Sequence, residues 1–175
     1  MNIVLMIIGV LALLTAILAL LAPKEMVVEE SVAVNKPKDQ VFDYIRLVKN
    51  QDNFSKWNMT DPNMKKSYKG TDGQVGFVYA WNSETNNNVG AGEQEIKAVN
   101  QDGTIDFELR FERPMKNVAQ AKMTAEAMSP TQTKVTWMFY GPTKFPMSIM
   151  TPMFRKMLGK DMATSLNNLK TLLEK

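Results

Sequence analysis

The sequence predicts an α+β fold in which a curved antiparallel sheet of about seven strands wraps around a long C-terminal helix. Three observations support this. Apolar residues recur every three or four positions from Thr151 to Lys175, several segments between residues 65 and 140 alternate apolar and polar residues, and only short turns separate those segments. Such a sheet, with one wet face, and an amphipathic helix bury their apolar sides best against each other. A separate transmembrane helix is expected at the N-terminus.

An uncharged apolar segment opens the chain. It runs from Ile3 to Ala22 almost without a break and ends at Pro23-Lys24-Glu25. Its length matches the roughly 20 residues that a helix needs to cross the apolar core of a bilayer. The alternative is a cleaved signal peptide, but no Lys or Arg precedes the segment, and Leu20-Leu21-Ala22 is a poor cleavage site. We therefore divide the chain into a transmembrane anchor, 1–23, and one globular domain, 24–175.

The charges that flank this segment bear on membrane orientation. Lys24, Lys36 and Lys38 follow it, and no basic residue precedes it. The positive-inside rule then favours a single-pass membrane protein whose domain lies on the cytoplasmic side. Neighbouring glutamates dilute this signal, so the side of the membrane stays open.

The domain is expected to begin with one strand and then short helices. Residues 26–34 predict a strand in which three valines share one face with Glu30 in register among them. A helix is expected from near Pro37, and a second short helix or turn at 50–57. Glu30 has two interpretations, because a buried carboxylate needs a partner. Either the strand is irregular and the carboxylate is solvated, or it is a polar anchor inside a cavity.

The middle of the chain predicts an antiparallel meander. Segment 118–128 places alanines and Met123 on one side of a strand, which either lets a helix approach closely or leaves room for a ligand. Gly90-Ala-Gly92 lacks the third glycine of a dinucleotide-binding fingerprint and is expected to form a β-bulge. Strands are expected at residues 65–69, 75–81, 89–99, 104–112, 118–128 and 133–140.

The C-terminal segment predicts the long helix. Thr151 is expected to cap it, and Pro152 suits its first turn. Gly159 lies inside the helix, where glycine costs about 1 kcal/mol relative to alanine. A side chain, a strand or a ligand that passes close by would explain it, and so would close packing alone. The apolar stripe of the helix comprises Phe154, Met157, Leu158, Met162, Leu166, Leu169 and Leu173.

Composition excludes several kinds of site. The 175 residues include no cysteine and no histidine, which removes disulfides, thiol nucleophiles, histidine bases and most zinc sites. The net charge is +3 and the charged residues are interspersed, so no nucleic-acid partner is expected. No metal or cofactor is expected either. The 14 methionines suit an irregular core or an adaptable apolar pocket, and core filling is the simpler interpretation.

From about Met26 to Lys175 the chain resembles a known superfamily. The resemblance rests on an ordered set of residues: Trp57, Asp61-Pro62, Gly70, Gly76, Trp81, Gly90-Ala-Gly92, Trp137 and the closing Leu166-Asn-Asn-Leu169-Lys170. In this order they resemble the helix-grip fold of the START-like, or SRPBCC, superfamily, and within it the polyketide cyclase/dehydrase-type proteins. The resemblance implies a deep apolar cavity between the sheet and the last helix, which holds lipids, sterols, polyketides or hormones. It carries over no catalytic residue.

The candidate ligand contacts are apolar side chains expected to face this cavity. The rings of Trp57 and Trp81 can stack on a flat ligand, and for every candidate the alternative is ordinary core packing. Glu30 is the candidate polar anchor, Asp61 is expected in a turn or cap, and no catalytic residue is identified. The candidate contacts are Trp57, Trp81, Phe107, Phe111, Met123, Trp137, Phe139, Met157, Leu158 and Met162.

Three functions fit these observations. The first is a membrane-anchored domain that binds a small hydrophobic molecule, lipid- or polyketide-like, without chemistry. The second is a cyclase- or dehydrase-like enzyme, which requires a carboxylate or tyrosine pointing into the pocket beside a hydrogen-bond partner. The third is a ligand-free interaction module at the membrane, which requires a filled interior and an exposed apolar patch.

Overall fold

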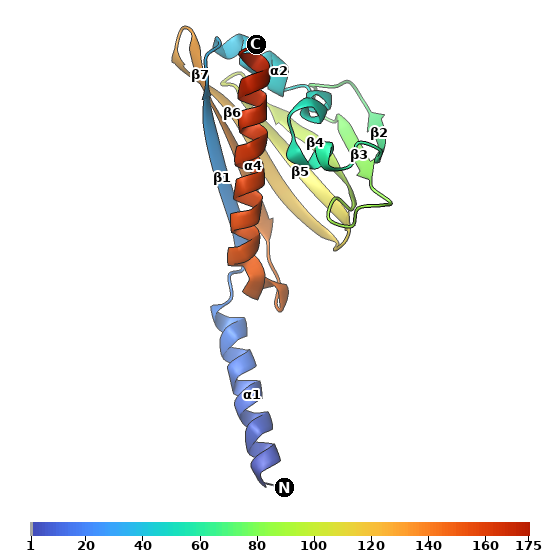
Figure 1. Cartoon of the computed structure of the whole chain (residues 1–175), viewed down its shortest axis with the longest axis vertical. Helices are drawn as coiled ribbons and strands as arrows, with labels where there is room; N and C mark the ends of the chain where they lie inside the picture. The colour runs from blue at the N-terminus through green and yellow to red at the C-terminus, as the bar shows by residue number, and fades with distance from the viewer. Residues whose placement is uncertain (1) are drawn as a thin grey trace.

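The computed structural model describes residues 2–175. Figure 1 shows one helix, α1 (Asn2–Leu21), extending from a domain in which a sheet curves around a second long helix, α4 (Thr151–Leu173). By length and composition, α1 is able to cross a membrane, and its apolar side chains are exposed. The shorter helices are α2 (Lys38–Ile45), η1 (Val48–Asn53), α3 (Lys56–Thr60) and η2 (Met147–Met150).

Seven antiparallel strands form one sheet in the order β1-β7-β6-β5-β4-β3-β2. Strands β2 to β7 follow one another as a meander, and β1 joins it beside β7. This arrangement confirms the predicted fold, and the strand boundaries lie within three residues of the expected ones. The strands are β1 (Glu25–Val34), β2 (Lys65–Lys69), β3 (Val78–Asn82), β4 (Ala91–Val99), β5 (Thr104–Arg113), β6 (Asn117–Ser129) and β7 (Gln132–Pro142).

The strand register aligns the inward side chains in rows that cross the sheet. We number the rows from the end of the sheet next to α1, where β1 begins and β7 ends, and call this the α1-proximal end. The first row is Trp81, Gly92 and Phe111; the second is Tyr79, Gln94, Leu109 and Ala119; the third is Ile96, Phe107, Ala121, Phe139 and Val28; the fourth is Ile105, Met123, Trp137 and Glu30.

The core is densely filled at the end of the domain distant from α1. Ile105 and Met123 of the fourth row are fully buried. Phe54 meets Trp137 edge-on at 6.3 Å between ring centroids. Helix α4 adds Met162, Leu166 and Leu169, and α2 adds Val41 and Ile45, all of them buried. These side chains are buried against one another in one apolar cluster, so this part of the interior is closely packed.

Helix α4 lies against β1, and Gly159 allows the two elements to approach each other closely. A β-carbon at Gly159 would stand 3.0 Å from Glu30 Oε1 and 3.5 Å from Val28 Cγ1. The glycine therefore makes room for side chains of β1, which was one of the expected explanations. The capping prediction was wrong, because Met150 occupies the N-cap position and Thr151 is already helical. The Thr151 hydroxyl is buried without a hydrogen-bond partner.

Gly90-Ala-Gly92 forms the expected irregularity at the start of β4. The β4–β5 register shifts between Ala91 and Gly92. Gly90 has a φ of +62°, a conformation that suits glycine, and a β-carbon there would clash with the carbonyl of Arg113. The bulge therefore brings the β4 backbone close to the end of β5.

Candidate functional site

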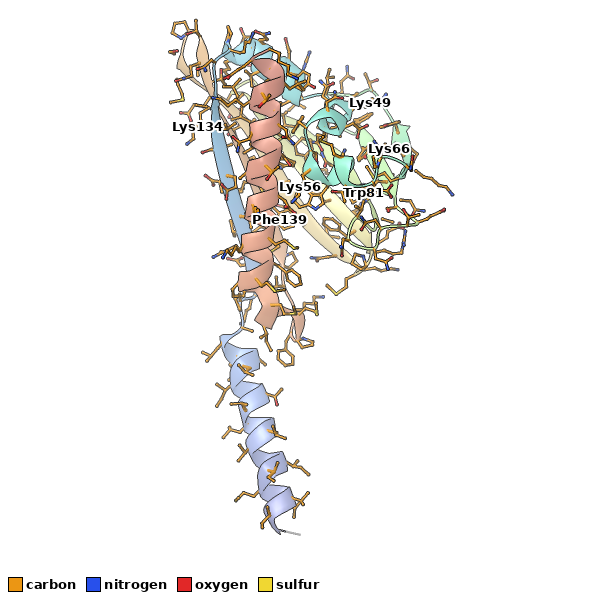
Figure 2. All side chains as sticks on the ribbon, in the orientation of Figure 1. Lys49, Lys56, Lys66, Trp81, Lys134 and Phe139 are labelled. Carbon is orange, nitrogen blue, oxygen red and sulfur yellow. The ribbon has the colours of Figure 1, made fainter. Side chains whose placement is uncertain are left out.

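The candidate site is the α1-proximal part of the concave sheet face, beside the first half of α4. Phe111, Trp81 and Leu109 point inward in the first two rows but remain half-buried, as does Phe139 in the third. Figure 2 marks Trp81 and Phe139, which come from strands at opposite sides of this surface. Inward apolar side chains that keep accessible area are the surface on which an apolar molecule is able to bind.

Two of these aromatic rings lie directly on glycines. A β-carbon at Gly92 would stand 2.8 Å from Cζ2 of Trp81, and one at Gly141 would stand 3.1 Å from Cε1 of Phe139. Trp81 is held further by its indole N–H, which donates to the Val89 carbonyl at 3.1 Å. Phe111 packs edge-on against Trp81 at 5.9 Å. The rings are therefore held against the sheet and form the floor of this part of the concave face.

Helices α3 and α4 bound this floor from the other side. Trp57 of α3 and Leu158 of α4 are half-buried against the core. The helices are joined by an ion pair between Lys56 and Asp161 and by a hydrogen bond from the Lys56 amide to Ser165 Oγ at 2.9 Å. These contacts fix the spacing between the two helices.

Gln94 is a polar group placed among the apolar side chains of the floor. It lies in the second row between Tyr79 and Leu109 and is only 7% exposed. Its Nε2 is buried and has no hydrogen-bond partner among the described residues. A buried donor without a partner costs about 1–3 kcal/mol. The Nε2 amide of Gln94 is therefore the inward polar group best suited to donate a hydrogen bond to an oxygen of a bound molecule.

A second polar group lies where β2 and β3 meet the short helices. Asn58 donates to Tyr79 Oη at 3.4 Å and to Asp52 at 2.8 Å, and Lys66 pairs with Asp52 at 2.9 Å. Burial raises the pKa of the Tyr79 phenol, and the nearby Asp52 carboxylate raises it further. The phenol thus stays protonated at neutral pH and acts as a hydrogen-bond donor rather than a base.

The structure contradicts the irregular strand of the first interpretation of Glu30, and the role of Glu30 as a polar anchor stays a prediction. Strand β1 is regular, and Glu30 points toward α4 beside Trp137, half-buried against Gly159. It lies in the fourth row, away from the half-buried aromatic rings of the first. Its carboxylate faces the interior as the second interpretation requires, but next to the filled part of the core.

The predicted contacts divide into three groups. Trp57, Trp81, Phe111, Phe139 and Leu158 border the candidate site. Phe107, Met123, Trp137 and Met162 are buried in the packed core, at 8% exposure or less. Met157 differs from the prediction more strongly, since its side chain is 55% exposed. The buried face of α4 passes through Gly159, Met162 and Leu166, and a helical rotation of about 100° per residue carries Met157 off its edge.

Sequence reasoning missed Gln94, Leu109, Tyr79 and Gly141. Period-two alternation along β4 and β5 puts Gln94 and Leu109 on the same face as Gly92 and Phe111, so this pattern was sufficient to find them. Gly141 carried no such signal, because only the fold shows that the Phe139 ring covers it.

Two hollows, of about 260 and 490 Å³, lie on the opposite, convex face of the sheet. Arg110 lines the larger one and pairs with Glu93 at 2.5 Å, with Glu95 at 2.7 Å and with Glu108. The hydrogen bond from Arg110 holds the pKa of Glu95 below its ordinary value. These charges satisfy one another, so this face is a weaker candidate than the concave one.

Asp61 has a structural role, as expected for a turn residue. It is 7% exposed and accepts hydrogen bonds from the Ser83 hydroxyl, from the Asn63 amide at 3.1 Å and from Thr85 at 3.4 Å. The Ser83 bond holds the pKa of this carboxyl below its ordinary value. Asp61 therefore fastens the α3–β2 turn to the β3–β4 loop.

Comparison with known proteins agrees with the fold. The profile of a family described as polyketide cyclase / dehydrase and lipid transport matches residues 25–174. No curated protein sequence matches significantly.

Several solved structures share the architecture. The Zhui aromatase/cyclase from a Streptomyces species is 13% identical with a TM-score of 0.66, covering 86% of this chain and 94% of its own. Norcoclaurine synthase from Thalictrum flavum is 12% identical with a TM-score of 0.66, covering 91% and 92%. Protein XoxI from Bacillus cereus is 12% identical with a TM-score of 0.61, covering 85% and 95%. At these identities the likeness establishes the fold alone.

Proposed function

The chain belongs to the family of polyketide cyclase / dehydrase and lipid transport proteins, and from this we propose that its concave sheet face binds a small hydrophobic molecule, lipid- or polyketide-like, without chemistry. The observation that carries the proposal is the contrast between the two ends of the interior. The inward apolar side chains of the fourth row, Ile105, Met123 and Trp137, are buried. By contrast, Trp81, Phe111 and Leu109 keep accessible apolar area near α1. Covering apolar area stabilises a complex by roughly 25 cal/mol per Å².

Gln94 gives the proposed ligand a polar end. Its unpaired Nε2 belongs to the second row, in which Gln94 lies between Tyr79 and Leu109. A small movement of this side chain presents the N–H to a carbonyl, carboxyl or hydroxyl oxygen of a ligand whose remainder covers the aromatic rings. The ligand class is therefore an apolar molecule with at least one hydrogen-bond acceptor, which fits a fatty acid and a polyketide and excludes a pure hydrocarbon.

We further propose that residues 1–23 anchor the domain in a membrane as a single-pass helix. The support is the length and composition of Ile3–Leu21 and the exposure of its side chains. The basic residues after the helix favour a cytoplasmic domain. Protease protection of the full chain in membrane vesicles of known orientation tests both statements, because digestion from the cytoplasmic side should remove the domain.

Ligand binding is tested on the full chain purified in a mild detergent. Organic extraction followed by mass spectrometry is expected to recover an apolar molecule with an oxygen acceptor in about one copy per chain. The test variant is Leu109→Ser, which makes the floor polar. Its matched control is Val118→Ser, which makes the same kind of change on an exposed side chain of β6. We expect Leu109→Ser to lose the molecule and Val118→Ser to keep it. Extracts that match detergent blanks, with the protein folded, contradict the proposal and favour a ligand-free interaction module.

A cyclase- or dehydrase-like enzyme is the second candidate function. The observation in its favour is the inward Tyr79 phenol, which has Asn58 as a hydrogen-bond partner and Lys66 and Asp52 nearby. A protonated phenol is able to donate to a ketone oxygen during an intramolecular aldol closure. In that step the attacking carbon between two carbonyl groups loses a proton to solvent, a carbon–carbon bond forms, and the ketone oxygen becomes a hydroxyl, which then leaves as water together with a second proton from the same carbon. Incubation with a synthetic linear β-triketone thioester tests this. The enzyme hypothesis requires that the protein forms the cyclised product faster than the spontaneous reaction does, and that Tyr79→Phe abolishes this acceleration.

A further inference from the structure

A second apolar surface lies outside the concave face, at the α1-proximal end of the domain. We call it the methionine patch. Its side chains are between 38% and 55% exposed, although all six are large and apolar. They fall within the 13 residues from 145 to 157, which cover η2 and the first turns of α4. The patch comprises Phe145, Met147, Ile149, Met150, Met153 and Met157.

The charges around the patch are all of one sign along the chain. Residues 141–160 contain no Asp and no Glu, whereas the domain elsewhere mixes acidic and basic residues. Exposed apolar side chains interspersed with basic ones are typical of segments that lie in the headgroup layer of a bilayer. Methionine suits such a surface because its side chain is flexible and adapts to an irregular partner. The basic residues in this stretch are Lys144, Arg155, Lys156 and Lys160.

Hydrogen bonds fasten the segment that carries the patch to the end of α1. Thr143 donates from its amide to the Lys24 carbonyl at 2.9 Å and from its hydroxyl to the Pro23 carbonyl at 2.6 Å. Arg155 donates to the Val27 carbonyl at 3.0 Å. Only Ala22, Pro23 and Lys24 separate α1 from β1. Figure 1 shows η2 and the start of α4 at the end of the domain from which α1 extends. A membrane that α1 crosses therefore meets this surface first.

We propose that the methionine patch is a second membrane contact, seated in the headgroup layer of the bilayer that α1 crosses. This rests on the membrane anchoring proposed above and not on ligand binding. The bilayer is the occupant that fits best, because Thr143, just before the patch, is hydrogen-bonded two and three residues beyond the end of α1, and the charged residues within the segment that carries the patch are basic. Anionic lipid headgroups complement these charges. The contact holds the domain at a fixed orientation, with the half-buried Phe154 and Leu158 in the same first turns of α4 as Met153 and Met157.

The absence of cysteine from the sequence makes a direct test practical. Single variants Met153→Cys, Met128→Cys and Leu11→Cys of the full chain are labelled with an environment-sensitive fluorophore and reconstituted into phosphatidylcholine vesicles with about one quarter phosphatidylglycerol. Met128 is the matched control, because it is 57% exposed against 54% for Met153 but lies near the end of β6, next to the β6–β7 turn. Leu11, in the middle of α1, reports insertion of the anchor. Quenching by lipids with a nitroxide near the headgroup or deep in the chain locates each label.

The fluorescence emission of the label at residue 153 is expected to shift to shorter wavelength in the vesicles. The headgroup nitroxide is expected to quench this label several-fold more than the label at residue 128. The effect should weaken without phosphatidylglycerol and should not change when the protein-to-lipid ratio is lowered. Equal behaviour at residues 153 and 128 overturns the proposal, whether or not residue 11 is quenched. A shift at residue 153 that disappears on dilution of the protein also overturns it and favours a second copy of the chain. Loss of the extracted ligand leaves this readout unchanged, so the two proposals fail separately.

Discussion

Replacing Gly92 by alanine should damage both the fold and the candidate site. The new β-carbon would stand 2.6 Å from the Arg110 carbonyl oxygen and 2.8 Å from Cζ2 of Trp81. Backbone in β5 cannot withdraw easily, since it pairs with both β4 and β6. The Trp81 ring has to tilt off the floor, and its 3.1 Å bond to the Val89 carbonyl weakens. Overpacking of this kind costs about 1–3 kcal/mol, which in a chain of this length lowers Tm by several degrees.

Gly159→Ala is the matched control, because the same atom is added at another close contact. There the nearest atom, at 3.0 Å, is the end of the flexible Glu30 side chain, and alanine also favours the helix by about 1 kcal/mol. We expect Gly159→Ala to unfold at the same or a slightly higher urea concentration than wild type, and Gly92→Ala at a clearly lower one. Tryptophan fluorescence of the full chain in detergent follows the transition. A Gly92→Ala protein with unchanged stability and unchanged extracted ligand would refute the arrangement of Trp81 over Gly92.

Three further predictions concern single side chains. Gln94→Leu replaces the unpaired buried amide by an apolar group, so the free energy of unfolding should rise by up to about 1–3 kcal/mol. The amount of extracted ligand should fall at least fivefold. Retention of the ligand would exclude Gln94 as its hydrogen-bond partner. Asp61 has a lowered pKa in the folded chain, so its contribution to stability is present above pH about 4 and is lost as pH falls through the folded pKa. Ser83→Ala removes the main cause of that shift and should move acid unfolding, followed by fluorescence, to higher pH; an unmoved midpoint contradicts this. Asp161→Asn weakens the pair with the partly exposed Lys56 and should cost no more than about 1 kcal/mol in urea unfolding, so a larger loss would mean that the pair holds α3 in place.

The sequence predicted the layers of this fold well because the apolar pattern sets which face of each element is buried. The alternation in β5 and β6 and the spacing in α4 needed no knowledge of the partners. Even Glu30 followed its strand, although a carboxylate among valines suggested an irregularity. Periodicity states which way a side chain points, and here that was sufficient for the architecture.

Periodicity does not state how much of the space in front of a side chain is filled. Met123 and Phe111 both alternate inward, yet Met123 is fully buried and Phe111 is half-buried, because Phe54 and the buried residues in the second half of α4 pack at the distant part of the sheet. Met157 belongs to the apolar spacing of α4 but lies beyond the edge of the contact with β1. The candidate site therefore required the register between strands and the position of α4, neither of which one segment of sequence contains.

Three departures from ordinary packing gather at the same end of the domain. Gln94 buries a donor without a partner, Trp81 and Phe111 keep apolar area accessible on a concave face, and the methionine patch exposes six large apolar side chains. Each departure costs stability in an isolated soluble domain, and a domain that only had to fold would have no reason to place them together. Under the proposals above, a bilayer relieves the third departure, and a molecule with an apolar body and an oxygen acceptor relieves the first two. Leu158, which borders the concave face, directly follows Met157 of the patch in α4. The two proposals together therefore predict that a ligand dissolved in the bilayer enters the site with little of its apolar surface passing through water.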